Sequence, residues 1–264
     1  MTTQNTFQKP IIACALVAVI LAVGMGLGFL VQWNVPLFYF LNGLPWPVLW
    51  SNLTELGDGL ILGVLLFPLL RHKPQLLSAY LLGIVVNTLV VQGLKFSFAL
   101  PRPAGVLDTE TFRILGPVLT ARAFPSGHTA TIFLVAAIVT YMFRGSVRWL
   151  ILLLASSVAI SRVSVGAHWP QDILAGALIG WVIGCSVAYG ITIRRLYPRQ
   201  LLGLILLGSI YFLAGIIAIG WYPGRYPDAF LTHSILPVIA WIWGTILWLS
   251  LLKNWIKQHQ IKRW

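Results

Sequence analysis

The chain has 264 residues, of which 58% are hydrophobic and only 9% are charged, whereas a soluble domain carries roughly 25% charged residues. This composition excludes an ordinary soluble protein and predicts an all-α, polytopic membrane helix bundle. The net charge of +12 would suit nucleic-acid binding. However, the basic residues cluster between alternate apolar runs, so we expect the lipid bilayer as a partner and no nucleic acid.

Eight apolar runs are expected to form about eight transmembrane helices, for which about 20 residues each suffice. They cover residues 11–33, 53–70, 76–100, 125–143, 149–160, 170–193, 201–221 and 231–252. Residues 34–50 are rich in aromatic residues and proline, which is typical of a segment at headgroup level. Because the connectors are short, we expect a single integral-membrane domain over residues 1–264.

Eight spans place both termini on the same side of the membrane. The basic clusters within residues 71–73, 144–148, 194–199 and 253–263 fall on that side, which is therefore expected to be cytoplasmic. All 6 acidic residues fall on the opposite side. Lys95, Arg102, His128, Arg162 and His168 are also expected on that outer face.

The connector between the fifth and sixth spans contains Arg162, His168 and Asp172. Arginine offers a planar fork for phosphate oxygens, and histidine is readily tuned as a nucleophile or proton carrier. Asp172 follows His168 by one helical turn, so its carboxylate can hold one ring nitrogen and leave the other free. A simple capped helix start at the membrane surface, with Pro170 in its first turn, is the alternative.

Two further stretches carry polar residues on the same face. Lys95 and Arg102 bracket the outer end of the third span, and Ser126-Gly127-His128 opens the fourth. Together with Arg162, these cations require an anionic partner, and a phosphoryl group fits best. Gly127 lets a backbone approach closely, and Ser126 can cap the helix or donate to phosphate. Taken singly, Lys95 or Arg102 could instead be a cation that snorkels to the interface.

Two histidines then divide the chemistry. His168 attacks phosphorus and forms a phosphohistidine, while His128 protonates the leaving oxygen and later activates water. The cations stabilise charge on the phosphoryl oxygens. We expect no metal and no other cofactor; a metal held by the two histidines and Asp172 is a distant alternative.

These three stretches, Lys95 to Pro103, Pro125 to His128 and Ser161 to Asp172, resemble the type 2 phosphatidic acid phosphatase family, which shares its site with vanadium haloperoxidases. The resemblance covers a phosphatase core of about residues 50–195. It implies an all-helical bundle and metal-independent hydrolysis of phosphoric ester or anhydride bonds in membrane lipids. Family members often have six spans, so the C-terminal helical pair at about residues 201–253 is additional.

In this family His168 is expected as nucleophile, Asp172 as its partner and His128 as acid and base. The expected phosphate-binding residues are Lys95, Arg102, Ser126, Gly127 and Arg162. Candidate substrates are undecaprenyl diphosphate, phosphatidylglycerol phosphate, phosphatidic acid and lipid A, at the outer face of a bacterial inner membrane. A vanadate-dependent haloperoxidase and a non-catalytic lipid-binding protein are the alternatives. The sequence does not indicate an oligomeric state.

The sixth span also carries a repeated small-residue pattern. Gly176, Gly180 and Gly184 follow Asp172 at four-residue intervals and continue its helical face. We expect a neighbouring helix to pack closely against this stripe.

Overall fold

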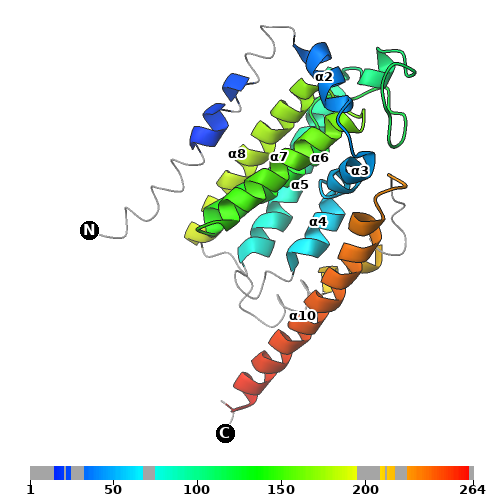
Figure 1. Cartoon of the computed structure of the whole chain (residues 1–264). Coiled ribbons are helices and arrows are strands. Elements are labelled where there is room, and N and C mark those ends of the chain that lie inside the picture. The colour runs from blue at the N-terminus through cyan, green and yellow to red at the C-terminus, as the bar shows by residue number, and fades with distance from the viewer. Residues whose placement is uncertain are drawn as a thin grey trace.

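The computed structural model describes residues 15–20, 22–24, 33–67, 75–194, 209–211, 213–217 and 225–261, and all regular structure within these ranges is helical (Figure 1). The main elements are α2 (Asn34–Asn42), α3 (Pro47–Glu55), α4 (Gly59–Leu66), α5 (Gln75–Phe98), the 3-10 turn η2 (Pro103–Gly105), α6 (Gly127–Met142), α7 (Val147–Ser164), α8 (Pro170–Arg194), the π-helical turn η4 (Leu231–Ile235) and α10 (Leu236–Ile261). The all-α prediction is confirmed.

Several helices have the length and apolar character of membrane spans. Four qualify in the described part of the chain, or up to five if α3 and α4, which are bent by 74°, form one broken span. The expected spans at residues 11–33 and 201–221 lie largely outside the described residues, so the count of eight stays a prediction. The length and apolar character of these helices are nevertheless those of a membrane protein.

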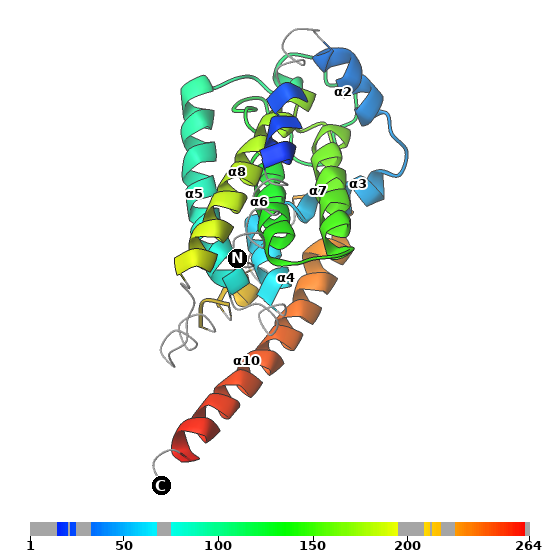
Figure 2. The ribbon, with the colours of Figure 1, turned by 90° about the vertical axis from the view of Figure 1, so that its left-hand side faces the viewer.

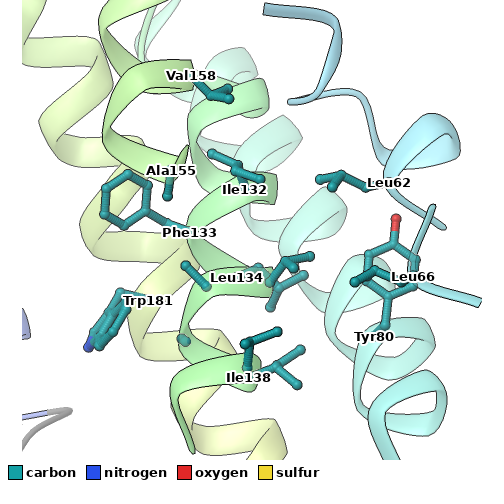
Figure 3. Packing of buried hydrophobic residues seen from close by; sticks show 14 of the residues in the cluster. Leu62, Leu66, Tyr80, Ile132, Phe133, Leu134, Ile138, Ala155, Val158 and Trp181 are labelled. Atoms are coloured by element: carbon teal, nitrogen blue, oxygen red, sulfur yellow. The ribbon is translucent and has the colours of Figure 1, made fainter. Parts of the chain in front are cut away.

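The helix α6 lies inside the bundle, between α5, α7 and α8 (Figure 2). Every residue from Thr129 to Thr140 is buried, so this 16-residue helix is enclosed by protein on all sides and can be apolar all round. Ile132, Leu134 and Ile138 pack among side chains from α4, α5, α7 and α8 (Figure 3). The hydrophobic core therefore surrounds α6 and directly follows the residues at its N-terminal end.

The glycine stripe of α8 faces α6. A Cβ atom at Gly180 would stand 1.9 Å from the carbonyl oxygen of Ala130, and Cβ atoms at Gly176 and Gly184 would each stand 2.5 Å from another carbonyl oxygen along α6 and its N-cap. The predicted close packing is confirmed, and it joins the helix that carries Asp172 to the helix that begins at Gly127.

The second expected span is wrong as a single helix over residues 53–70. The helix α3 ends at Glu55, and α4 begins after Asp58, whose carboxylate accepts hydrogen bonds from Leu60 N (2.8 Å) and Ile61 N (3.3 Å). Asp58 therefore caps a new helix, whereas Glu55 is buried at the end of the previous one. Between them Gly57 packs against α6: its Cβ would stand 2.7 Å from His128 Cβ.

The C-terminal helix α10 crosses beside α4 and then extends beyond the bundle (Figures 1 and 2). Tyr211 connects the two helices, because its ring stacks on Phe67 at 3.5 Å between centroids and its hydroxyl donates to Ala240 O at 2.7 Å. The expected eighth span agrees with an apolar helical segment at Leu231–Asn254, which begins with the η4 turn, and the helix α10 itself continues to Ile261. One face of the C-terminal pair is thereby fixed to the bundle.

Candidate active site

The three polar stretches of the sequence meet at one cavity of about 930 Å³, in the size range of small-molecule sites. Six of the residues expected to act on a phosphoryl group line it: Lys95, Arg102, Gly127, His128, Arg162 and His168. The other two, Ser126 and Asp172, are buried behind this lining, with 0% and 3% of their surface exposed. The eight residues expected to act on a phosphoryl group are thus neighbours in space.

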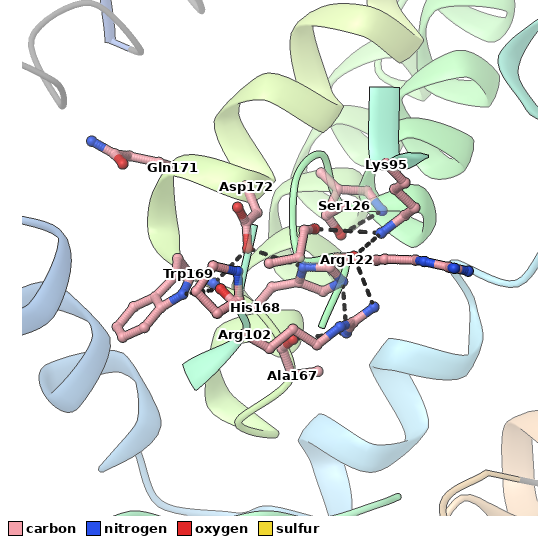
Figure 4. A network of polar contacts seen from close by, with 12 residues as sticks. Lys95, Arg102, Arg122, Ser126, Ala167, His168, Trp169, Gln171 and Asp172 are labelled. Atoms are coloured by element: carbon pink, nitrogen blue, oxygen red, sulfur yellow. Dashed lines mark hydrogen bonds and ion pairs between the residues drawn. The ribbon is translucent and has the colours of Figure 1, made fainter. Parts of the chain in front are cut away.

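His168 lies in the short connector between α7 and α8, and only 2% of its surface is exposed (Figure 4). Its Nδ1 is 3.1 Å from Asp172 Oδ2, and the same oxygen accepts a hydrogen bond from Trp169 N at 2.9 Å. Asp172 sits in the first turn of α8. The carboxylate therefore fixes the imidazole from one side and is itself held by the backbone.

The connector turns sharply to place His168. The carbonyl oxygen of Arg162 accepts hydrogen bonds from the backbone N–H groups of Ala167 (3.1 Å) and His168 (3.2 Å). Gly166 adopts φ +80°, and a Cβ there would stand 2.4 Å from Arg113 O. Glycine is required at this turn, both for its backbone conformation and for the close approach of the neighbouring loop.

Arg102 approaches His168 from the side opposite Asp172. Its Nη1 lies 3.3 Å from His168 Nε2 and donates to Ala167 O at 2.9 Å, while its Nε donates to Ala121 O at 2.9 Å. The guanidinium is therefore oriented by main-chain carbonyls. No carboxylate neutralises it within the described residues, so its full charge is available to an anion.

Lys95 is held in the same way at the last turn of α5. Its Nζ donates to Arg122 O at 2.7 Å and to Ala123 O at 3.4 Å, and 8% of its surface is exposed. Burying an ammonium group is costly unless it finds oxygen partners. The carbonyl groups of residues 121–123 supply those partners for both Lys95 and Arg102 and keep the two cations at the cavity wall.

Arg162 is oriented by hydroxyl groups. Its Nη1 donates to Thr54 Oγ1 at 2.5 Å and to the Tyr226 hydroxyl at 2.7 Å, and only 3% of its surface is exposed. Its Nε has no hydrogen-bond partner among the residues that the structure describes. Arg162 is thus a third buried cation at the cavity with neutral partners.

The start of α6 forms the floor of the site. Ser126 is the N-cap: its Oγ accepts from Thr129 N at 3.5 Å and from Thr129 Oγ1 at 3.0 Å, and its own N–H donates to Asp172 O at 3.0 Å. At Gly127 a Cβ would make only an ordinary 3.6 Å contact with Val91. Glycine there keeps space in the cavity and is not forced by packing. His128 lines the cavity one residue later.

Comparisons with known proteins agree with this arrangement. A model of the PAP2 superfamily matches residues 76–196. The crystal structure of Aquifex aeolicus LpxE is similar at TM-score 0.55 and 31% sequence identity, covering 59% of this chain and 94% of that one. This chain belongs to the PAP2 superfamily.

Curated PAP2 relatives are matched over shorter stretches. The undecaprenyl-diphosphatase of Sulfolobus acidocaldarius is 34% identical over 111 residues, which are 41% of this chain and 48% of that protein. The lipid A 1-phosphatase of Porphyromonas gingivalis is 30% identical over 113 residues, 42% of this chain and 22% of that protein. The chain thus spans less than half the length of the curated relatives it matches.

In this PAP2 protein the tautomer of His168 follows from its neighbours. A guanidinium only donates hydrogen bonds, so the nitrogen that faces Arg102, Nε2, must be the acceptor, and Nδ1 carries the proton toward Asp172. Burial, together with the charges of Arg102, Arg162 and Lys95, holds the pKa of His168 well below its ordinary value. The imidazole is therefore neutral at pH 7, with its lone pair on Nε2.

Sequence reasoning missed several residues of this site. Gly57 supports His128, and Thr54 and Tyr226 hold Arg162. Arg225 also lines the cavity, as does Arg122, which the sequence already places on the expected outer face. The only sequence signal for Arg225 and Tyr226 is their position in a polar connector before the last apolar run, on the expected outer face.

Proposed function

We propose that this PAP2 protein is a lipid phosphatase that hydrolyses a phosphomonoester or diphosphate of a membrane lipid through a phosphohistidine at His168. The observation that carries the proposal is the environment of His168. A neutral imidazole with its lone pair on Nε2 stands among three cations whose partners are carbonyl and hydroxyl groups. Such a site is complementary to a phosphoryl group that approaches a nucleophile.

The reaction proceeds in two displacements. Nε2 of His168 attacks phosphorus, the bond from phosphorus to the leaving lipid oxygen breaks, and His128 gives that oxygen a proton. Water then attacks the phosphohistidine while His128 accepts a proton from it. The phosphorus–nitrogen bond breaks, and inorganic phosphate leaves. Lys95, Arg102 and Arg162 stabilise the charge on the phosphoryl oxygens in both steps, and Asp172 stabilises the proton on Nδ1.

An apolar pocket supports a lipid as the substrate. It has a volume of about 230 Å³, lies between α4, α5 and the segment of Tyr211, and shares Gly59, Leu60 and Ile84 with the polar cavity. A molecule whose phosphate contacts His168 can therefore continue into apolar surroundings along α4. A phosphate headgroup with a hydrocarbon tail has this distribution of charge.

The orientation is proposed from charge. The opposite end of α6 from His128 is basic, with Arg144 in the turn between α6 and α7 and Arg148 in the first turn of α7. Placing that basic turn in the cytoplasm puts the cavity at the outer leaflet. We therefore propose a bacterial inner-membrane protein with its site facing the periplasm and both termini in the cytoplasm.

The first candidate substrate is a diphosphate carrier lipid such as undecaprenyl diphosphate. A cavity with several unneutralised cations favours a highly charged headgroup. The names of two relatives, an undecaprenyl-diphosphatase and a lipid A 1-phosphatase, also favour phosphorylated envelope lipids. Phosphatidylglycerol phosphate and phosphatidic acid complete the set to be tested.

The test measures phosphate release from these lipids in detergent, with a chelator present. The purified protein should release phosphate, and His168→Ala should abolish release, whereas Arg144→Gln, an exposed arginine on the far side, should leave it unchanged. A base-stable, acid-labile phosphoprotein trapped by rapid quenching would support the phosphohistidine. Halide oxidation with vanadate, or lipid binding without turnover, would overturn the proposal.

A further inference from the structure

The C-terminal segment reaches the proposed catalytic cavity, although it lies outside the residues that match the PAP2 model. That match ends at residue 196, whereas Arg225 lines the cavity and Tyr226 contacts Arg162, which also lines it. Tyr226 is only 5% exposed, its hydroxyl accepts from Arg162 Nη1 at 2.7 Å, and the Arg162 guanidinium carbon lies 5.8 Å from its ring centroid. The segment is therefore in direct contact with a phosphate-binding candidate.

Hydrogen bonds fasten this segment to α3. The side chain of Asn52 donates from Nδ2 to Asp228 O at 3.0 Å, and its Oδ1 accepts from both the N–H and the hydroxyl of Thr232 at 3.2 Å. The ring of Tyr226 also lies against Gly116, where a Cβ would stand 2.6 Å from a ring carbon. Arg225 is thus presented to the cavity by an anchored stretch of backbone.

The charge of Arg225 lies on one side of the site. Its side chain is exposed, and neither ion pair in the described part of the chain involves it. Electrostatically it acts on His128 and Arg102, but it is not among the main charges that act on His168. Geometry places Arg225 on the side of His128: its backbone hydrogen-bonds to Glu55, two residues before Gly57, where a Cβ would stand 2.7 Å from His128 Cβ.

A diphosphate needs cations in two places. Lys95, Arg102 and Arg162 surround the terminal phosphoryl group that His168 attacks. The second phosphate, which stays with the lipid, leaves on the side of His128 and carries the electron pair of the broken phosphorus–oxygen bond. An arginine there offers a charge-assisted, bidentate contact that a monophosphate ester cannot use.

We propose that Arg225 binds the lipid-linked phosphate of a diphosphate substrate, and that the C-terminal helical pair makes this protein selective for diphosphates. The inference rests on the proposed function of the His168 cavity. In the reaction, Nε2 bonds to the terminal phosphorus and the bridging oxygen departs with the lipid monophosphate. His128 protonates that oxygen, and Arg225 neutralises part of its charge.

The experiment compares a prenyl diphosphate with the prenyl monophosphate of the same chain length, in detergent. Arg225→Gln should lower kcat/KM for the diphosphate about tenfold more than for the monophosphate, since a hydrogen bond to a charged group is lost only with the former. Arg225→Lys, which keeps the charge without the fork, should recover part of that ratio. The matched control Arg144→Gln should leave the ratio unchanged.

Two outcomes separate the two proposals. If the wild-type protein hydrolyses neither lipid, the phosphatase proposal fails. If it hydrolyses both, and Arg225→Gln lowers them equally or not at all while the thermal midpoint in detergent is unchanged, the selectivity proposal alone fails. Tyr226→Phe serves as a second variant: it keeps the ring but removes the hydroxyl from Arg162, so it should lower turnover of both lipids together.

Discussion

The closed wall, where α8 packs behind α6, uses its glycines differently from the open wall, where α4 and α5 line the cavity. At Gly180 a Cβ would stand 1.9 Å from a backbone oxygen of α6, which cannot move without shifting the helix. At Gly63 on α4 a Cβ would meet only the ring of Tyr80, at 3.2 Å. The first wall is closed and positions Asp172 against the start of α6, whereas the second leaves an apolar pocket. The closed wall fixes the position of Asp172, and the open wall leaves space for a ligand.

The largest effect is expected where the closed wall touches the nucleophile. In Asp172→Asn the side-chain amide can turn its NH₂ group toward His168 Nδ1, which favours a proton on Nε2 and removes the lone pair. We expect kcat to fall about 10²- to 10⁴-fold with little change in KM, by analogy with oriented histidines in other hydrolases. Steady-state kinetics on a detergent-solubilised lipid phosphate measure this. A drop confined to KM would contradict the assigned role of Asp172.

The next prediction separates the closed wall from the rest of α8. Gly180→Leu forces a side chain into the α6 backbone and should destabilise the protein by about 1–3 kcal/mol or more while lowering turnover. The matched control is Gly190→Leu on the same helix, where a Cβ meets nothing within 4 Å. Thermal unfolding in detergent and phosphate release check both. Unchanged turnover in purified Gly180→Leu would refute the idea that this contact positions the site.

The pH dependence of kcat/KM tests the effect of the buried cations on the pKa of His168. Because burial and three cations hold the pKa of His168 below its ordinary value, kcat/KM should be retained at neutral pH and lost only as pH falls through that lowered pKa. Lys95→Met removes one repelling charge, which raises the pKa of His168, so the acid limb should move to higher pH. The limb of Arg144→Gln should not move. A limb that shifts to lower pH in Lys95→Met would be inconsistent with this account.

The smallest effect is expected at the open wall. Ile84→Trp fills the junction between the polar cavity and the apolar pocket, so turnover of a long-chain lipid phosphate should fall about tenfold. A short water-soluble phosphate ester should be hydrolysed as before. Leu82→Trp, on the same helix but 48% exposed, is the control. Equal losses on both substrates would show that the pocket does not hold the tail.

The sequence predicts a contact best when the two residues are close together in the chain. His168 and Asp172 are four residues apart, so the spacing predicts their contact, although His168 lies in the turn before α8 and not within the helix. The convergence of Lys95, Arg102 and His128 follows from their positions at helix ends on one expected face. The roles of these residues, and the outer-leaflet orientation, stay predictions until the experiments above are done.

Other features depend on contacts between distant residues. The 74° bend between α3 and α4 does not show in hydropathy, because the two helices together are apolar enough for one span, and the contact of Gly57 with His128 is seen only in the fold. The contact of Tyr226 with Arg162 joins residues 64 positions apart. No periodicity connects such pairs, so only the fold reveals them.

The way in which Lys95 and Arg102 are held has a consequence for how this protein can diverge. Their partners in the loop at residues 121–123 are main-chain oxygens, which every amino acid supplies. Substitutions that keep the backbone path, which includes φ +57° at Arg122 and the buried Ala123, therefore keep the contacts of both cations. A compound that targeted these two cations would, for the same reason, meet few routes to resistance through substitution of the loop.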